Sequence, residues 1–140
     1  MDLTHSVIVF PVRAGKVALA QRQQGMRMAG QYVTPGGSID PEDDSIPVAA
    51  LRELKEETAL EVPESRLVYL GHLTTKGDDW QPIGGHFFML RLAEDEELKQ
   101  TEPDAQGPWE WYGYREAAAL PLAPVTRSLV HLLAHAAEGG

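Results

Sequence analysis

Three glutamates stand close together on one predicted helix, in the segment Arg52-Glu53-Leu54-Lys55-Glu56-Glu57. At about 100° per residue, Glu53, Glu56 and Glu57 fall on a single arc roughly 100° wide. Carboxylates three or four residues apart repel one another by a few tenths of a kcal/mol per pair. Carboxylate oxygens are hard ligands that suit Mg²⁺ or Mn²⁺, and these ions also bind phosphate oxygens. The spacing therefore favours a divalent-cation site that acts on a phosphorylated ligand.

The helix that carries these glutamates is expected to run from Val48 to Thr58. Ser45 is the expected N-cap, and Pro47 falls in the first turn, where its missing N–H costs least. The arc expected to be buried is formed by Pro47, Ala50, Leu51, Leu54 and Thr58. Because glutamate-rich surface helices are common, a solvated, charged face without any ion is the competing interpretation.

The rest of the chain alternates short strands with loops and ends in a second helix. Strands are expected at residues 5–12, 16–22, 32–34, 66–73, 86–92 and 109–112. Residues 13–15 predict a hairpin turn, and loops are expected at 23–31, 76–85 and 93–108. The terminal helix, 126–137, has an apolar stripe formed by Leu129, Leu132, Leu133 and Ala136. Mostly antiparallel strands with two helices indicate an α+β fold, and the length fits a single domain spanning residues 1–140.

The composition limits the classes of function. The chain of 140 residues has no cysteine, which excludes disulfides, thiolate metal sites and cysteine nucleophiles. A net charge of −9 disfavours binding to a nucleic acid polymer, although a metal ion can still join an acidic protein to a polyanion. We find neither a signal peptide nor an apolar stretch of the roughly 20 residues that a membrane span needs, so we expect no membrane association and a cytoplasmic location.

A glycine-rich segment before the helix completes a longer pattern. The sequence Gly30-Gln31-Tyr32-Val33-Thr34-Pro35-Gly36-Gly37 leads into an acidic loop, and Asp44 precedes Arg52 by the usual seven intervening residues. Residues 36–60 resemble the Nudix box of the Nudix hydrolase family, including its MutT-like members. The resemblance implies the Nudix fold, a mixed β-sheet sandwiched between α-helices. It also implies a Mg²⁺-dependent hydrolase, with Mn²⁺ as the alternative ion, that cleaves a diphosphate linkage in a nucleoside diphosphate derivative.

Three features depart from the family pattern. The loop after Gly37 is one residue longer than in the standard box, and Asp44 replaces the first glutamate with a shorter side chain. Ala59 replaces the glycine that normally leaves the helix in a left-handed conformation, at a cost on the order of 1 kcal/mol. None of these changes affects the three glutamates.

The resemblance also implies roles for individual residues. Glu56, Glu57 and the backbone carbonyl of Gly36 would bind the metal, and Glu53 would be a further ligand or a base for water. Arg52 would orient the glutamates through bidentate hydrogen bonds. A later acid is common in the family, and the loop before Trp109 offers Asp104 first, with Glu102 close behind. An acidic surface loop is the alternative interpretation of these two residues.

Residues outside the box offer weaker signals. Arg22 is the best candidate for binding substrate phosphates among three arginines that precede the box, the others being Arg13 and Arg27. Tyr32 and Trp80 are candidates for stacking on a base. His86 opens a predicted strand, where a structural role is more common. His131 and His135 have a zinc-compatible spacing, but a solvated helix face is the better interpretation.

Two other functions compete with hydrolysis. A non-catalytic Nudix-like module that binds or senses a nucleotide is the first, although such a module has no need of all three glutamates. An isoprenoid diphosphate isomerase on the same fold is the second, but that chemistry uses a cysteine in the family, and this chain has none. The substrate within the nucleotide class and the oligomeric state stay open, with a homodimer as one arrangement seen among similar proteins.

Overall fold

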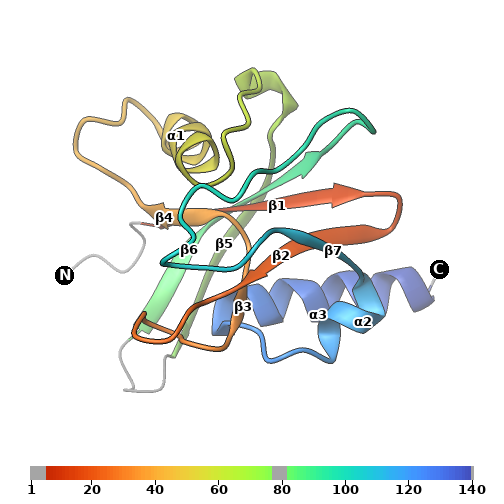
Figure 1. Ribbon diagram of the computed structural model, residues 1–140. Helices are drawn as coiled ribbons and strands as arrows, with labels where there is room; N and C mark the ends of the chain where they lie inside the picture. The colour runs from red at the N-terminus through yellow and green to blue at the C-terminus, as the bar shows by residue number, and fades with distance from the viewer. Residues whose placement is uncertain (1–5, 77–81, 140) are drawn as a thin grey trace.

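The computed structural model describes residues 6–76 and 82–139 (Figure 1). Its strands are β1 (Ser6–Arg13), β2 (Lys16–Gln21), β3 (Tyr32–Val33), β4 (Gly36–Ser38), β5 (Val68–Lys76), β6 (Pro82–Arg91) and β7 (Glu110–Gly113). Its helices are α1 (Ile46–Thr58), the 3-10 turn η1 (Glu64–Arg66), α2 (Tyr114–Ala118) and α3 (Pro124–Gly139). Within these residues, none of the helices has the length and apolar character that crossing a bilayer requires.

The strands form one mixed sheet with helices on both faces. The strand order is β3-β2-β1-β6-β5, with β4 paired to β1 and β7 paired to β2. Strands β1 and β6 are parallel, whereas the other pairings are antiparallel. Figure 1 shows α1 on one face of the sheet and α2 with α3 on the other. The expected arrangement of a mixed sheet between helices in an α+β protein is therefore confirmed.

Alternating side chains of β1 build the two halves of the core. Val7 and Val9 are fully buried on the face covered by α1, where they pack with Leu54. Phe10 is fully buried on the opposite face, in the same hydrophobic cluster as Val130 of α3. Successive side chains of a strand point to opposite faces, so a strand covered on both sides is apolar throughout. This packing fixes α1 directly over β1 and beside β4.

Several element boundaries differ from the sequence-based expectation. Gly36 and Gly37 were expected to end the preceding strand, but they belong to a strand of their own, β4. This strand was missed because glycines have no side chains to show an alternating pattern. Strands β5 and β6 extend into the expected 76–85 loop, and the short helix α2 was not expected. The hairpin turn at 13–15 is confirmed, with positive φ angles of 51° at Ala14 and 77° at Gly15.

Among the described side chains of the terminal helix, the expected apolar stripe is wrong at Leu132, while Ala136 lies outside these side chains. Leu132 is 60% exposed, whereas Val130 is fully buried. Residues two apart on an α-helix are separated by about 200°, so Leu132 lies nearly opposite the buried Val130. His131 and His135 are both exposed, as expected for a solvated face.

Candidate metal and nucleotide site

Helix α1 has the predicted N-cap and ends at the predicted Thr58, although it begins at Ile46, two residues before the expected Val48. The Ser45 hydroxyl accepts a hydrogen bond from the Val48 N–H at 3.2 Å, which confirms the N-cap. At the other end, Ala59 has φ 63° and ψ 10°, so the left-handed exit is present with alanine in place of glycine. An alanine in this conformation costs on the order of 1 kcal/mol relative to glycine.

The last four carbonyls of α1 all accept hydrogen bonds, although helix ends commonly leave these groups to water. The Ala59 N–H donates to the first of them, the Lys55 carbonyl, at 2.9 Å. Donors from residues 99–109 satisfy the others: Thr101 Oγ1 to Glu56 O at 2.6 Å, Trp109 Nε1 to Glu57 O at 3.1 Å, and Lys99 N to Thr58 O at 2.9 Å. A segment distant in sequence therefore holds the turn that carries two of the glutamates.

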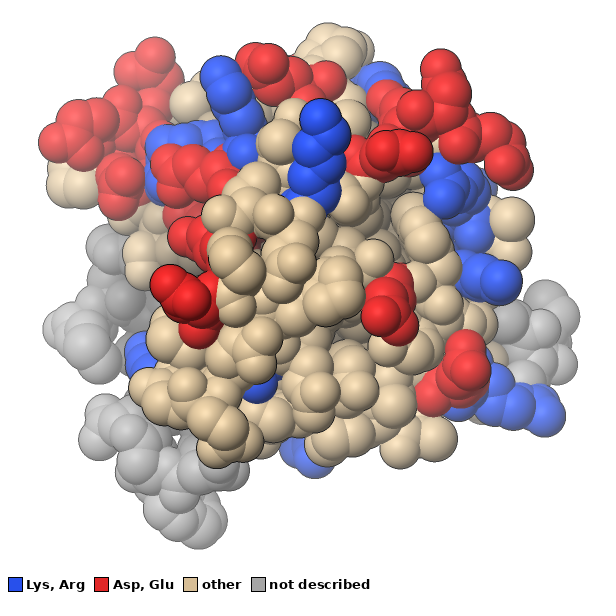
Figure 2. Space-filling view, viewed as in Figure 1, with Lys and Arg blue, Asp and Glu red and all other residues tan. Residues whose placement is uncertain are grey.

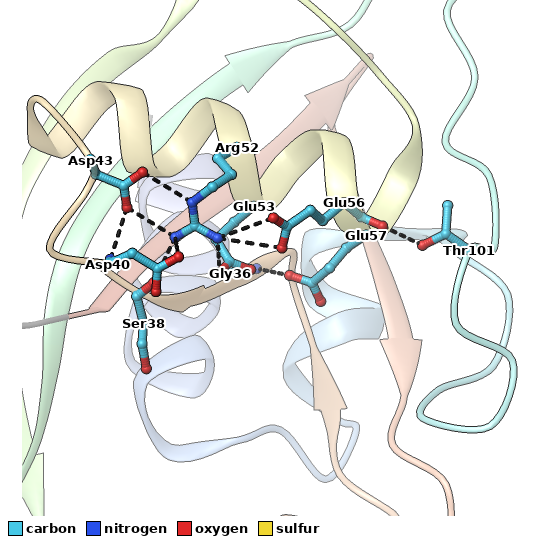
Figure 3. A network of polar contacts seen from close by, with 9 residues as sticks. All are labelled: Gly36, Ser38, Asp40, Asp43, Arg52, Glu53, Glu56, Glu57 and Thr101. Atoms are coloured by element: carbon cyan, nitrogen blue, oxygen red, sulfur yellow. Dashed lines mark hydrogen bonds and ion pairs between the residues drawn. The ribbon is translucent and has the colours of Figure 1, made fainter.

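The two glycines of β4 bring the strand against the glutamate face of α1 (Figure 3). The Gly36 N–H donates to Glu57 Oε2 at 2.7 Å. A Cβ atom placed on Gly37 would lie 2.5 Å from the Glu53 carboxylate, and one on Gly36 would lie 2.5 Å from the Val7 carbonyl oxygen. Both positions thus require glycine because of close approach within a strand, rather than because of a tight turn.

Arg52 is the cation around which most of the acids gather (Figure 3). Its Nη1 donates to Glu53 Oε1 at 3.0 Å and to Glu56 Oε2 at 3.2 Å. Its Nε and Nη2 donate to the two carboxylate oxygens of Asp43, each at 3.0 Å, and Nη2 also donates to the Ser38 carbonyl at 2.9 Å. Arg52 thus contacts two of the three glutamates, but its bidentate partner is Asp43.

Asp43, and not Asp44, is the acid that pairs with the box arginine. The expectation that Asp44 fills the first acidic position is wrong, because Asp44 is exposed and the ion pair forms at Asp43. Five residues separate Asp43 from Gly37, which is the standard spacing, so the additional residue lies between the acid and the helix. The Asp43 carboxylate also accepts the Asp40 N–H at 2.8 Å, and the bond from Arg52 holds the pKa of Asp43 below its ordinary value.

Glu57 is the buried member of the three glutamates, with 8% of its surface exposed. Its Oε1 accepts a hydrogen bond from Gln106 Nε2 at 3.2 Å. Burial raises the pKa of Glu57 to about 8, and the negative charges of Glu53 and Glu102 add to this effect, against the opposing hydrogen bonds. In the described part of the chain, no lysine or arginine forms an ion pair with Glu57. Its negative charge therefore lacks a cation from the protein.

The donor set around Glu57 fits a divalent cation. Glu53 and Glu57 both border Gly36-Gly37, and burial also raises the pKa of Glu53. Among residues 6–76 and 82–139, no three acidic or histidine side chains are arranged to hold a metal ion, and Glu56 is turned toward Arg52. A third carboxylate ligand therefore requires Glu56 to leave Arg52. Ligation by the Gly36 carbonyl stays a prediction.

The loop at 93–108 contributes an amide to the site. Asp104 is exposed, and its side chain forms no hydrogen bond or ion pair with the rest of the described chain. Glu102 lies near enough to raise the pKa of Glu57. Gln106 is the buried residue of this loop that bonds to Glu57, and it was not singled out from the sequence because it is uncharged. Asp43 was also missed, although the five-residue spacing after Gly37 could have identified it.

A cavity of about 310 Å³ opens beside these groups. Its walls include Glu57, both glycines of β4, Arg22, Arg27 and residues 123–126 at the start of α3. Arg22 is fixed there by two hydrogen bonds, from Nε to the Arg27 carbonyl at 3.3 Å and from Nη1 to Gln106 Oε1 at 3.1 Å. The cavity thus places cationic and acidic groups on its walls, as a phosphorylated ligand with a metal ion requires.

The other residues considered from the sequence lie elsewhere. Tyr32 packs edge to face on Tyr112 with ring centroids 5.9 Å apart, while its neighbours 33 and 34 line the cavity. Arg13 stacks over Trp111 and bonds to the Ala93 carbonyl. The remaining two are His86, which bonds to the Tyr69 hydroxyl, and Trp80, which lies outside the described residues.

Comparison with known proteins identifies the family. The family model described as NUDIX domain matches residues 2–133. The chain belongs to the NUDIX domain family. It is 37% identical over 89 residues to the protein described as uncharacterized Nudix hydrolase NudL of Yersinia enterocolitica, a match that covers 58% of this chain and 45% of that protein. The chain therefore spans less than half of the length of this relative.

Solved structures of the family share the fold. The MutT NUDIX hydrolase of Burkholderia pseudomallei superposes with a TM-score of 0.77 at 21% identity, over 93% of this chain and 98% of that one. The NUDIX domain of Shewanella oneidensis NrtR, solved in complex with ADP ribose, has a TM-score of 0.77 at 20% identity, over 97% of this chain and 88% of that one. The Nudix fold expected from residues 36–60 is confirmed.

Proposed function

We propose that this protein is a Mg²⁺-dependent hydrolase that cleaves a diphosphate linkage in a nucleoside diphosphate derivative. The observation that carries the proposal is Glu57, a buried carboxylate that faces a cavity and has no cationic partner among residues 6–76 and 82–139. Acidic side chains also gather around α1 and the loop before it (Figure 2), which raises the local affinity for a divalent cation. Family membership and the names of the relatives support the same reaction class.

The residues of the site divide the work of this reaction. Glu57, Glu53 and Glu56 would hold the ion together with the Gly36 carbonyl, once Glu56 leaves Arg52. Arg52 keeps Glu53 in place through its 3.0 Å hydrogen bond. When bound, Mg²⁺ neutralises the phosphate charge and makes phosphorus more susceptible to attack by water. Glu53 would accept the proton of the attacking water, since its carboxylate lies against Gly37, and Gly37 lines the cavity.

Binding of the substrate falls to the walls of the cavity. Arg22 and Arg27 bind phosphate oxygens, and Tyr32 supports the wall on which the base rests. The acid outside the box is Asp104 or Glu102, of which Glu102 already acts on Glu57 electrostatically. We assign these roles to one domain of residues 1–140 that acts in the cytoplasm on a small nucleotide, with a homodimer as the proposed assembly.

A panel of nucleotides tests the reaction. The protein is incubated with Mg²⁺ and nucleoside triphosphates, nucleotide sugars, ADP-ribose or dinucleoside polyphosphates, and the products are identified by mass spectrometry. We expect phosphorylated fragments from at least one compound, and their loss in the Glu57→Gln variant. Glu61→Gln is the matched control, since Glu61 is an exposed glutamate that pairs only with Lys55.

A nucleotide sensor is the alternative, and the ADP ribose bound to the NUDIX domain of the Shewanella protein is the observation that favours it. Calorimetry separates the two functions. Tight binding of ADP-ribose with Mg²⁺ and no product after prolonged incubation would select the sensor and contradict the hydrolase.

A further inference from the structure

Gln106 lies between the cavity wall and the buried glutamate. It is 2% exposed, and both ends of its amide are bonded. Its Oε1 accepts a hydrogen bond from Arg22 Nη1 at 3.1 Å, and its Nε2 donates to Glu57 Oε1 at 3.2 Å. A continuous chain of side-chain hydrogen bonds therefore runs from an arginine of the cavity to a proposed metal ligand.

The direction of this chain is fixed by the chemistry of its ends. A guanidinium only donates hydrogen bonds, and an ionised carboxylate only accepts them. The Gln106 amide must therefore keep its oxygen toward Arg22 and its nitrogen toward Glu57. Its backbone is equally constrained, since its carbonyl accepts a bond from Gln100 Nε2 at 2.9 Å and its N–H donates to the Glu102 carbonyl at 3.1 Å.

We propose that Gln106 is a positioning residue that orients the Glu57 carboxylate for the metal ion and couples it to Arg22. An ionised carboxylate has about four lone-pair positions. The Gly36 N–H occupies one lone pair of Oε2, and the Gln106 amide occupies one lone pair of Oε1. One lone pair on each oxygen is left for a cation. Without Gln106, only the Gly36 bond would fix the rotation of the carboxylate. This inference rests on the proposed function, in which Glu57 binds the ion.

The neutrality of Gln106 matters for the same reason. An amide orients Glu57 and leaves its negative charge intact, so the attraction for a divalent ion is retained. A carboxylate in this position would repel Glu57 and add a further ligand, and an apolar side chain would leave Glu57 Oε1 without its donor. The two replacements are therefore expected to change metal affinity in opposite directions.

The test measures Mn²⁺ binding to the full chain without substrate, by calorimetry and by the electron paramagnetic resonance of free Mn²⁺. Gln106→Met removes both hydrogen bonds at nearly constant volume, and we expect it to weaken Mn²⁺ binding about 10- to 100-fold, as is typical of residues that orient metal ligands. Gln106→Glu is expected to tighten binding on the order of tenfold, because it adds a negative charge beside Glu57. Gln23→Met is the matched control, since Gln23 is an exposed glutamine that bonds to the Pro103 carbonyl of the same loop.

Coupling to Arg22 is tested with a double-mutant cycle. The effects of Arg22→Met and Gln106→Met on Mn²⁺ affinity are expected to deviate from a simple product by at least about twofold. In turnover assays, Gln106→Met is expected to raise the Mg²⁺ concentration for half-maximal rate, with kcat recovering toward the unmodified protein at saturating Mg²⁺. A merely structural role would lower stability and leave this metal dependence unchanged.

The outcomes separate this inference from the proposed function. If Mn²⁺ affinity is unchanged in Gln106→Met, or unchanged in Gln106→Glu should the methionine variant fail to fold, the positioning role is wrong even if the protein hydrolyses nucleotides. If Mn²⁺ affinity shifts in both directions as expected but no nucleotide is cleaved, the positioning role stands and the hydrolase proposal fails. If the unmodified protein binds no Mn²⁺, both are contradicted.

Discussion

Two arginines of this protein bind carboxylates in contrasting ways. Arg66 forms a one-to-one pair with Glu96, in which Nη1 and Nη2 each lie 2.6 Å from a carboxylate oxygen. Arg52 instead stands among four acids, Asp40, Asp43, Glu53 and Glu56, within ion-pairing distance of each. The first pair balances its charge, whereas the second group retains three net negative charges (four acids against one arginine).

The difference shows how a structural ion pair and a ligand site are distinguished. The bonds from Arg66, together with the Ala93 N–H, lower the pKa of Glu96 to about 2. Glu57 lies next to the Arg52 group and forms no ion pair with the described lysines and arginines, and burial raises its pKa to about 8. Glu96 is stabilised as an anion by the protein itself. Glu57 needs an external cation to be equally stable when ionised, which is the property expected of a metal ligand.

The largest effect is expected where the unbalanced charge is removed. Glu57→Gln should lower kcat/KM by more than the roughly 10- to 100-fold that second-shell changes cause, because a direct ligand is lost. Glu96→Gln should leave kcat/KM within about twofold, since Glu96 is remote from the cavity. Steady-state kinetics with the hydrolysed nucleotide measures both. Equal losses in the two variants would contradict the distinction between the two regions.

Replacing each arginine by lysine tests the contrast between Arg52 and Arg66 in a second way. Lysine keeps the charge but lacks the planar fork that holds two oxygens. Arg52→Lys should lower kcat/KM about 10- to 100-fold because Glu53 and Asp43 lose their alignment. Arg66→Lys should cost at most about 1 kcal/mol of unfolding free energy, since the pair is partly exposed, and should leave activity unchanged. Urea titrations and kinetic assays of the two variants provide the measurement.

The two pKa shifts predict opposite dependences of stability on pH in the metal-free protein. The pKa of Glu57 is raised from 4.5 to about 8, so its contribution is fully present below pH 4.5 and is lost as the pH rises through about 8. The pKa of Glu96 is lowered to about 2, so its contribution is present above pH 4.5 and is lost as the pH falls through about 2.

Thermal unfolding in the presence of a chelator checks these signs. Glu57→Gln should raise Tm at alkaline pH and have little effect near pH 4.5, whereas Glu96→Gln should lower Tm at neutral pH. Saturating Mg²⁺ should remove most of the alkaline loss in the unmodified protein. A Tm for Glu57→Gln that follows the unmodified protein at every pH would be inconsistent with an unpaired, buried carboxylate.

The smallest expected effect concerns backbone strain at the end of α1, which is separate from the charge of its glutamates. Ala59→Gly should raise the unfolding free energy by about 1 kcal/mol, since glycine adopts a left-handed conformation without strain. Ala14→Gly, at a φ of 51° in the hairpin turn, is the matched control and should gain a similar amount. Both gains should be independent of pH and of Mg²⁺. A gain at Ala59 that disappears with Mg²⁺ would show that the helix exit is coupled to the charged site.

The local features of the molecule could be predicted from the sequence. The Ser45 cap is confirmed because it depends on a few neighbouring residues. The sequence did not predict that Ala59 keeps the left-handed conformation normally supplied by glycine, since the alanine suggested a reshaped helix exit. The arc of glutamates on α1 follows from helical geometry alone. The resemblance of residues 36–60 to the Nudix box identified the fold. Ligand roles for the glutamates and for Gly36 stay predictions.

Features that depend on distant contacts could not be predicted. Strand β4 forms because Gly36 and Gly37 pair with β1, and glycines leave no alternation that would reveal it. Gln106 reaches Glu57 from 49 residues away, and nothing in a single glutamine indicates such a contact. Asp44 was chosen in place of Asp43 because counting back from Arg52 assumes a helix start of standard length. The parallel pairing of β1 with β6 likewise depends on chain topology.

The final turn of α1 is tied down by residues that follow it by up to 52 positions, through the bonds that Thr101 and Trp109 donate to its carbonyls. Isolated helices fray first at their ends, and Glu56 and Glu57 lie in such an end. A peptide of residues 45–60 would therefore keep all three glutamates and still lose their mutual geometry. Amide exchange in this turn should accordingly slow only when segment 99–109 docks, so the order of the glutamates is acquired with the tertiary fold rather than with the helix.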